Sequence, residues 1–151
     1  GGGFEIALDC DMIVAADDAK FGFPESNAGM TVTGGASKLL SMVVGLNKAR
    51  ELILTGEFIN ASEAHRIGLV NKLVPVGNEE KEAERIAKVI MTRAPLSVAN
   101  HKRMLQNAAE SSFEAVLEME KQTITNLIYT EDYGEAISAF SDKRKPDFKG
   151  R

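Results

Sequence analysis

The chain has 151 residues, of which 44% are hydrophobic and 26% are charged, and its formal net charge is −4. This composition supports a buried core and excludes a disordered chain, and the acidic balance gives no electrostatic case for nucleic-acid binding. No apolar run approaches the roughly 20 residues that a membrane span needs.

The first 25 residues combine glycines, apolar runs and two carboxylates. Three glycines open the chain, and a nearly all-round apolar pattern predicts a short buried helix over residues 3–10. A continuous apolar run with β-branched members predicts a strand over 12–16 that is covered on both faces. A second short strand over 21–23 is stopped by a proline, and the loop that follows carries Glu25.

Short helices and strands are expected to alternate over the middle of the chain, because glycines and capping residues divide its apolar runs. The expected elements are a loop over 29–35, a helix from Ala36 to Gly45, a helix capped by Asn47 and followed by Gly56, a strand fragment at 58–59, a helix from a capping box at 60–63 to Gly68, and a strand over 69–74.

From residue 79 the pattern becomes helical almost to the end, so the change from mixed α/β to all-α structure falls near residues 92–95. The later helices are expected to start at the first-turn proline Pro95 and at the caps Ser112 and Thr130. Their apolar residues are expected to face inward, and the stripe from Phe113 to Ile128 is expected to be buried largely against other subunits or the core. These are Phe113, Val116, Leu117, Ile124, Leu127 and Ile128 in one helix, and Ala136, Ile137 and Phe140 in the next.

Two glutamates and the opening glycines are the candidates for chemistry. Backbone N–H groups at a glycine-rich helix start can hold a developing oxyanion, because no Cβ blocks the ligand. Glu5 lies one turn into that helix, and Glu25 follows a strand that should pack beside it, so the two carboxylates could move protons in one cleft. The alternatives are a packing or turn role for the glycines, a solvated or salt-bridged Glu5, and a surface-loop Glu25.

The other reactive side chains indicate no second site of comparable strength. His65 and His101 have no carboxylate or cysteine at ligand spacing, so no metal site is expected and both should lie on helix surfaces. Cys10 lies in an apolar run and is expected to be a buried small hydrophobe; a lone cysteine fits a reducing compartment. The basic tail Lys143-Arg144-Lys145 is either a solvated end or a source of cations for a ligand's phosphates.

Five blocks of the sequence resemble the enoyl-CoA hydratase/isomerase (crotonase) family, in family order and at family spacing over the whole chain. The first two are Gly-Gly-Gly-Phe-Glu-Ile-Ala-Leu-Asp-Cys-Asp and Ala-Lys-Phe-Gly-Phe-Pro-Glu. The others are Leu-Thr-Gly-Glu-Phe-Ile-Asn-Ala-Ser-Glu-Ala, Gly-Leu-Val-Asn-Lys-Leu-Val-Pro and the closing Ala-Ile-Ser-Ala-Phe-Ser-Asp-Lys-Arg-Lys-Pro-Asp-Phe.

The resemblance implies an α/β crotonase (ClpP-like) spiral of ββα units, incomplete at its N-terminus and followed by a helical trimerisation region. Residues 1–93 would form the C-terminal part of the crotonase core, and residues 94–151 the helical oligomerisation region. The implied substrate is an acyl-CoA thioester, and the implied assembly is a homotrimer or a dimer of trimers. No cofactor beyond the CoA of the substrate, no nucleic acid and no membrane span is expected. The expected location is the cytoplasm, with the mitochondrial matrix as the alternative.

Three residues match the family's catalytic positions. Gly2 matches the glycine whose N–H forms one arm of the oxyanion hole around the thioester carbonyl. Glu5 and Glu25 match the two glutamates that handle water and the α-proton in hydratases. Because both glutamates are kept, the resemblance implies an enoyl-CoA hydratase, which adds water to a trans-2-enoyl-CoA.

Four further residues match substrate-binding positions. Gly1 and Thr33 fall in segments that bind substrate and place water, while Phe140 and Lys143 match tail residues that reach toward the CoA of a neighbouring subunit. Val32 stands where hydratases usually carry a proline, and Thr33 stands where they carry a glycine. This departure makes an enoyl-CoA isomerase or another crotonase-type reaction the second hypothesis. The chain is about half the family's usual length, which makes a non-catalytic fragment the third.

Overall fold

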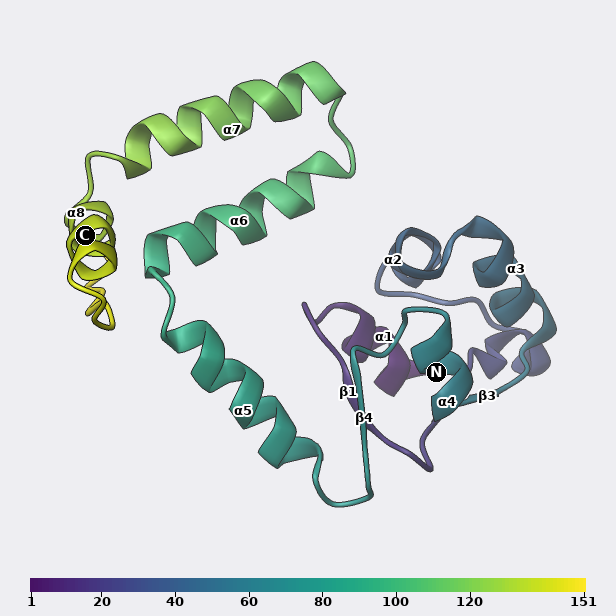
Figure 1. The fold of residues 1–151 in the computed structure, drawn as a ribbon. Coiled ribbons are helices and arrows are strands. Elements are labelled where there is room, and N and C mark those ends of the chain that lie inside the picture. Colours follow the sequence, from purple (N-terminus) through teal and green to yellow (C-terminus); the bar gives the residue numbers. More distant parts are fainter. The chain divides into compact units, whose positions relative to one another are not determined.

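A computed structural model describes the whole chain from Gly1 to Arg151, and its elements fall into two units, Gly1–Glu84 and Arg85–Arg151 (Figure 1). The first unit contains α1 (Gly2–Leu8), β1 (Val14–Ala16), β2 (Lys20–Phe21), the 3₁₀ helix η1 (Pro24–Ala28), α2 (Ala36–Val44), α3 (Leu46–Thr55), β3 (Ile59–Asn60), α4 (Ala61–Arg66) and β4 (Lys72–Val74). Helix α5 (Glu79–Met91) contains the boundary, and the second unit continues with α6 (Pro95–Ala108), α7 (Phe113–Leu127) and α8 (Glu131–Ser141).

The strands of the first unit form two small sheets. β1 and β4 pair in parallel, with Val14 opposite Lys72 and Ala16 opposite Val74. β2 and β3 pair in antiparallel fashion, with Phe21 opposite Ile59. A parallel pair needs a crossover connection, and here η1, α2, α3 and α4 lie in the chain between β1 and β4.

An aromatic cluster ties α1 to the segment that leads into η1. The Phe4 ring stacks on Phe23 with centroids 4.5 Å apart, and it meets Phe21 edge-on at 5.4 Å. All three side chains belong to the buried core of the first unit. Because Phe4 precedes Glu5 and Phe23 lies two residues before Glu25, this cluster holds the backbones of both glutamates in one neighbourhood.

Several expectations for the first unit were wrong in detail. Helix α1 is amphipathic rather than buried all round, because Ile6 is 72% exposed. Cys10 is exposed instead of buried. Glu25 lies in the first turn of η1, not in a loop, and α3 is capped by Gly45 rather than by Asn47. The cap prediction failed because Gly45 serves both as the C-cap of α2 and as the N-cap of α3.

The helix starts of the second unit were predicted correctly. Pro95 occupies the first turn of α6, the Ser112 hydroxyl accepts a hydrogen bond from the Ala115 N–H, and the Thr130 hydroxyl accepts one from Tyr133. Helices α6 and α7 lie side by side as an antiparallel pair (Figure 1). No helix has the length and apolar character that a bilayer crossing requires.

Most of the later apolar residues are exposed within this chain, so their expected burial against its own core was wrong, while burial against other subunits stays a prediction. Phe113 on α7 is 72% exposed, and Phe140 on α8 is 88% exposed. The apolar pattern predicts which residues share a helix face, but burial needs a partner surface that this chain does not supply. The sequence boundary at residue 94 coincides with the start of α6, whereas the two units separate inside α5.

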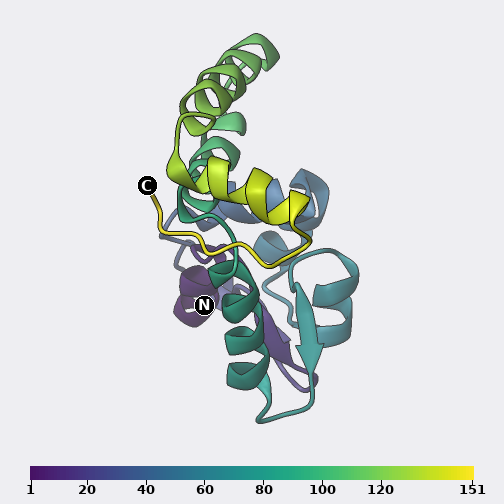
Figure 2. The same ribbon diagram turned by 60° about the vertical axis from the view of Figure 1, so that its left-hand side comes forward.

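The C-terminal segment turns back along α8, as Figure 2 shows. The reversal passes through Lys143, whose φ is +55°. The Asp132 carboxylate, only 4% exposed as a residue, then accepts hydrogen bonds from the N–H groups of Lys149 at 2.7 Å and Gly150 at 2.8 Å. Buried acceptors with two partners of this kind anchor a segment that has no regular structure of its own.

Candidate active site

The first turn of α1 presents free backbone donors. The Gly1 carbonyl accepts hydrogen bonds from the N–H groups of Phe4 at 2.8 Å and Glu5 at 3.2 Å, whereas those of Gly2 and Gly3 have no acceptor in the protein. A Cβ built on Gly2 or Gly3 would meet no atom within 4 Å. Two N–H groups at a helix start therefore stand beside open space, where a ligand oxygen can approach.

Glu25 places its carboxylate against the residue that begins this turn. Its Oε1 lies 3.4 Å from the Gly1 nitrogen, which also donates to the Gly22 carbonyl at 2.6 Å. The side chain is only 14% exposed, and Oε2 is shielded from solvent without any hydrogen-bond partner. A buried oxygen without a partner is rare in native proteins, so this atom is open to a hydrogen bond from a donor outside the described residues.

Glu5 is held by a single residue from a distant loop. The Thr33 N–H donates to Oε1 at 2.5 Å, and the Thr33 hydroxyl donates to Oε2 at 3.0 Å. The backbone N–H, and next the hydroxyl, hold the pKa of Glu5 below its ordinary value, while partial burial works in the opposite direction. The lowered pKa keeps Glu5 ionised, and an ionised carboxylate can accept a proton but has none to give.

Two glycines, Gly22 and Gly56, allow η1 and the segment before it to pack closely against the rest of the first unit, which positions Glu25. A Cβ on Gly22 would come within 2.9 Å of Phe58 Cδ1, and one on Gly56 would come within 3.0 Å of Asn27 Nδ2. Gly56 also has a φ of +64°, which side chains other than glycine adopt at a cost. Sequence reasoning missed both roles, although a glycine inside a short strand pattern signals close backbone approach.

The structure thus brings five of the predicted residues to the start of α1: Gly1, Gly2, Glu5, Glu25 and Thr33. Phe140 and Lys143 lie in the second unit, at the end of α8, where the Phe140 carbonyl accepts a hydrogen bond from the Lys143 N–H. Two carboxylates beside unpaired N–H groups can transfer protons while the N–H groups hold a developing negative charge.

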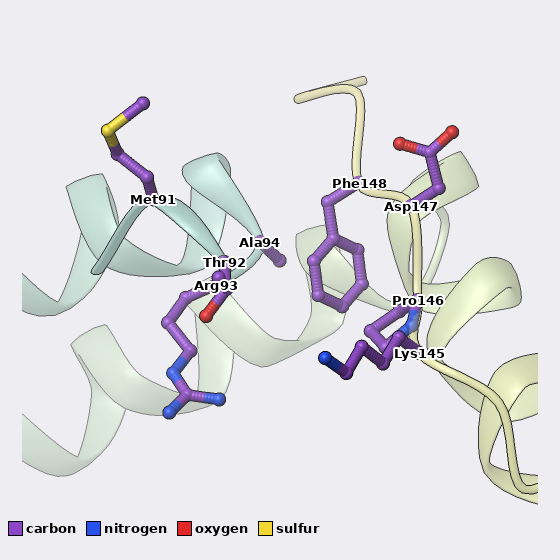
Figure 3. A pocket seen from close by; sticks show the side chains of 8 residues that line it. All are labelled: Met91, Thr92, Arg93, Ala94, Lys145, Pro146, Asp147 and Phe148. Atoms are coloured by element: carbon purple, nitrogen blue, oxygen red, sulfur yellow. The ribbon is translucent and has the colours of Figure 1, made fainter. Parts of the chain in front are cut away.

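A separate hollow of about 640 Å³ lies within the second unit, between residues 91–94 and 145–148 (Figure 3). The Phe148 ring and the Lys145 side chain extend into the space between these segments. Its one carboxylate, on Asp147, already pairs with Lys149 at 2.6 Å, and the hollow contains no second acid. The reactive groups are at α1, and we assign the candidate site there.

Comparison with known proteins gives one family. The family model described as enoyl-CoA hydratase/isomerase matches residues 1–151. A 2,3-dehydroadipyl-CoA hydratase of Escherichia coli (strain K12) is 39% identical over 151 residues, covering 100% of this chain and 59% of the relative. A short-chain-enoyl-CoA hydratase of Clostridium acetobutylicum is 39% identical over 152 residues, covering 100% and 58%. The chain therefore spans less than two thirds of the length of these relatives.

Solved structures of the same family also resemble this chain. The enoyl-CoA hydratase of Bacillus anthracis superposes with a TM-score of 0.96 at 37% identity, covering 100% of this chain and 58% of that one. An enoyl-CoA hydratase subunit of Geobacillus kaustophilus HTA426 gives a TM-score of 0.95 at 36% identity, with coverage of 100% and 59%.

Proposed function

The chain belongs to the enoyl-CoA hydratase/isomerase family and has a crotonase-like α/β fold rich in helices, and from this premise we propose that the intact protein adds water to a trans-2-enoyl-CoA thioester. The observation that supports the proposal is that Glu5 lies in the first turn of α1 and Glu25 Oε1 lies 3.4 Å from the Gly1 nitrogen that precedes this turn, next to the unpaired N–H of Gly2. Two carboxylates can supply the acid and base for hydration of a conjugated thioester, and a backbone donor can stabilise the enolate oxygen.

In the proposed reaction, the two glutamates have different tasks. Glu5, bound by two donors, accepts a proton from water as the water oxygen bonds to Cβ of the enoyl group. The electrons of the double bond move toward the thioester carbonyl, which becomes an enolate. Glu25 then delivers a proton to Cα, and its shielded Oε2 without a protein donor suits the atom that carries this proton. Glu5 thus gains one proton from water and Glu25 loses one to Cα, so the total number of protons is unchanged.

The Gly2 N–H is the proposed donor to the enolate oxygen. One such donor contributes roughly 3–4 kcal/mol to transition-state stabilisation in other oxyanion holes. Gly2 has open space around its Cβ position, so the thioester carbonyl can approach closely. We propose that the second donor comes from a residue outside 1–151, since the relatives extend well beyond the matched region.

Substrate binding and assembly complete the proposal. Gly1 and Thr33 border the reacting atoms, while Phe140 and Lys143 contact the CoA of a neighbouring subunit. The exposure of Phe140 supports this, because 88% of a large apolar side chain is open to a partner. Residues 94–151 would mediate a homotrimer or a dimer of trimers in the cytoplasm, with no cofactor beyond the CoA of the substrate. Analytical ultracentrifugation of the intact protein tests the assembly, and a monomer would refute it.

Hydration of crotonyl-CoA, followed by loss of the absorbance of the conjugated thioester, tests the activity. We expect Glu25→Gln and Glu5→Gln each to lower kcat by about 10²–10⁴-fold, the usual contribution of a general acid or base. Glu51→Gln is the matched control, because Glu51 lies on the exposed side of α3 and pairs only with Lys48. A Glu25→Gln enzyme as fast as the wild type would refute the role given to Glu25.

Enoyl-CoA isomerisation is the second candidate, and the loop before α2 favours it. Val32 and Thr33 replace the proline and glycine that the resemblance leads us to expect, and Thr33 contacts Glu5 directly. A hydroxyl at this place alters the space available to a reacting water. Incubation with a 3-enoyl-CoA separates the two: a 2-enoyl product, or a 3-hydroxyacyl product formed from it, supports isomerisation, whereas a 3-enoyl-CoA left unchanged by an enzyme that hydrates crotonyl-CoA supports hydration alone.

A further inference from the structure

Thr33 alone donates hydrogen bonds to both carboxylate oxygens of Glu5. Thr33, 28 positions away in the sequence, donates its N–H to Oε1 and its hydroxyl to Oε2. Together the two bonds form a fork, which fixes both the direction of the carboxylate and its rotation about the last side-chain bond. A single N–H would fix one oxygen and leave that rotation free.

Thr33 itself is anchored by the start of α2. Its carbonyl accepts a hydrogen bond from the Ala36 N–H at 2.9 Å, and Ala36 is 1% exposed in the core. The next residue, Gly34, packs beside Glu5, with its Cβ position 3.8 Å from Glu5 Cβ. Because threonine is β-branched, few side-chain rotamers compete with the one that points the hydroxyl at Glu5.

From this geometry we propose that the Thr33 side chain is a positioning residue for Glu5: its hydroxyl orients the carboxylate and keeps it in the form that accepts a proton. The inference rests on the proposed function and deepens it. Every residue type except proline supplies the N–H at this position, but the second donor must come from a side chain, and here it is the Thr33 hydroxyl. The hydroxyl thus distinguishes this site from one with glycine at the same place.

The surroundings of Glu5 contain few other charges. The acid on η1 is Glu25, which lies against Gly1. The loop over 29–35 carries no ionisable side chain, and Lys38 is the only ionisable residue of α2. Both Thr33 donors favour the ionised form of Glu5 and are the main causes of its lowered pKa. Loss of one donor therefore raises that pKa, so the protonated form of Glu5 persists to a higher pH.

Thr33→Val tests the proposal, because valine has nearly the same shape, keeps the N–H and removes the hydroxyl. In the intact protein we expect the acid limb of kcat/KM for crotonyl-CoA to move to higher pH and kcat near neutral pH to fall about tenfold, the worth of one hydrogen bond to a charged group. Thr33→Ser should restore both. Thr31→Val is the control in the same loop, since its hydroxyl has no hydrogen-bond partner in the structure, and it should behave like the wild type.

Carbon NMR titration of the Glu5 carboxyl without substrate separates this proposal from the proposed reaction. If the wild type hydrates no enoyl-CoA, the proposed function fails, yet the titration of Glu5 in Thr33→Val should still move to higher pH. If Glu5 titrates alike in the wild type, Thr33→Ser and Thr33→Val, the positioning role is refuted, whatever the activity. Should Thr33→Val not fold, a titration in Thr33→Ser that matches Thr33→Gly, without hydroxyl, would refute it equally.

Discussion

Gly22 and Phe58 approach so closely that no side chain fits between them. A Cβ on Gly22 would lie 2.9 Å from Phe58 Cδ1 and 3.0 Å from Cγ, and it would also lie 3.0 Å from the Glu57 carbonyl oxygen. The Gly22 carbonyl in turn accepts the hydrogen bond from the Gly1 nitrogen. This contact therefore connects the packing of the first unit with the position of its catalytic candidates.

Gly22→Ala should destabilise the protein by about 1–3 kcal/mol, the usual cost of forcing an extra methyl group into a packed place. The Phe58 ring is partly exposed and can move, but the Glu57 carbonyl belongs to the backbone and cannot. The urea midpoint of unfolding measures this loss. The hydration rate should fall as well, because Glu25 follows three residues later. A variant with unchanged midpoint and rate would contradict the close contact.

Gly134→Ala should have the opposite effect. Gly134 lies inside α8, has an ordinary helical φ, and a Cβ there would meet no atom within 4 Å. Alanine in such a position stabilises a helix by roughly 0.5–1 kcal/mol, because it restricts the unfolded chain. The same urea titration measures the gain. A loss of stability would mean that a partner surface fills the space beside Gly134.

Asp132→Ala should release the C-terminal segment. The substitution leaves the N–H groups of Lys149 and Gly150 without acceptors, at a cost of about 1–3 kcal/mol. Hydrogen exchange followed by mass spectrometry should show faster exchange at these two amides. Glu131→Gln is the control in the same helical turn, since its ion pair with Arg151 is about 70% exposed and should contribute little. Equal exchange in both variants would contradict the anchoring role.

Glu135 should make stability depend on pH in the acid range. The Arg144 guanidinium, aided by the Asp147 N–H, lowers the pKa of Glu135 from 4.5 to about 2. Because the folded-state pKa is depressed, the stabilisation is present above 4.5 and is lost as pH falls toward 2. Thermal unfolding should therefore separate wild type from Glu135→Gln at neutral pH and converge near pH 2. Glu118→Gln, whose exposed carboxylate faces Lys121, should show no such convergence.

Local signals were sufficient for most helix starts. Asn60, Ser112 and Thr130 were predicted as caps, and in each case the side-chain oxygen accepts a hydrogen bond from the N–H three residues on. The second half of the capping box at Asn60 did not form, because Glu63 pairs with Arg66 and Lys48 instead. A cap with its partner three residues away is decided by the local chain, whereas a carboxylate on a long side chain can choose among neighbours.

The sequence by itself determined the family and predicted the two glutamates and the glycines as site residues, because these residues follow a spaced pattern over the chain. Only the tertiary structure decided what holds each of them. The hydrogen bonds from Thr33 to Glu5 join residues 28 positions apart in the sequence. The contact of Gly22 with Phe58 joins the residue after β2 to the residue before β3. Such contacts depend on how distant segments pack, so no local pattern encodes them. The sequence predicted that Glu5 and Glu25 share one site, and the tertiary structure gave the Glu5 carboxylate two donors and the Glu25 carboxylate a shielded oxygen that has none.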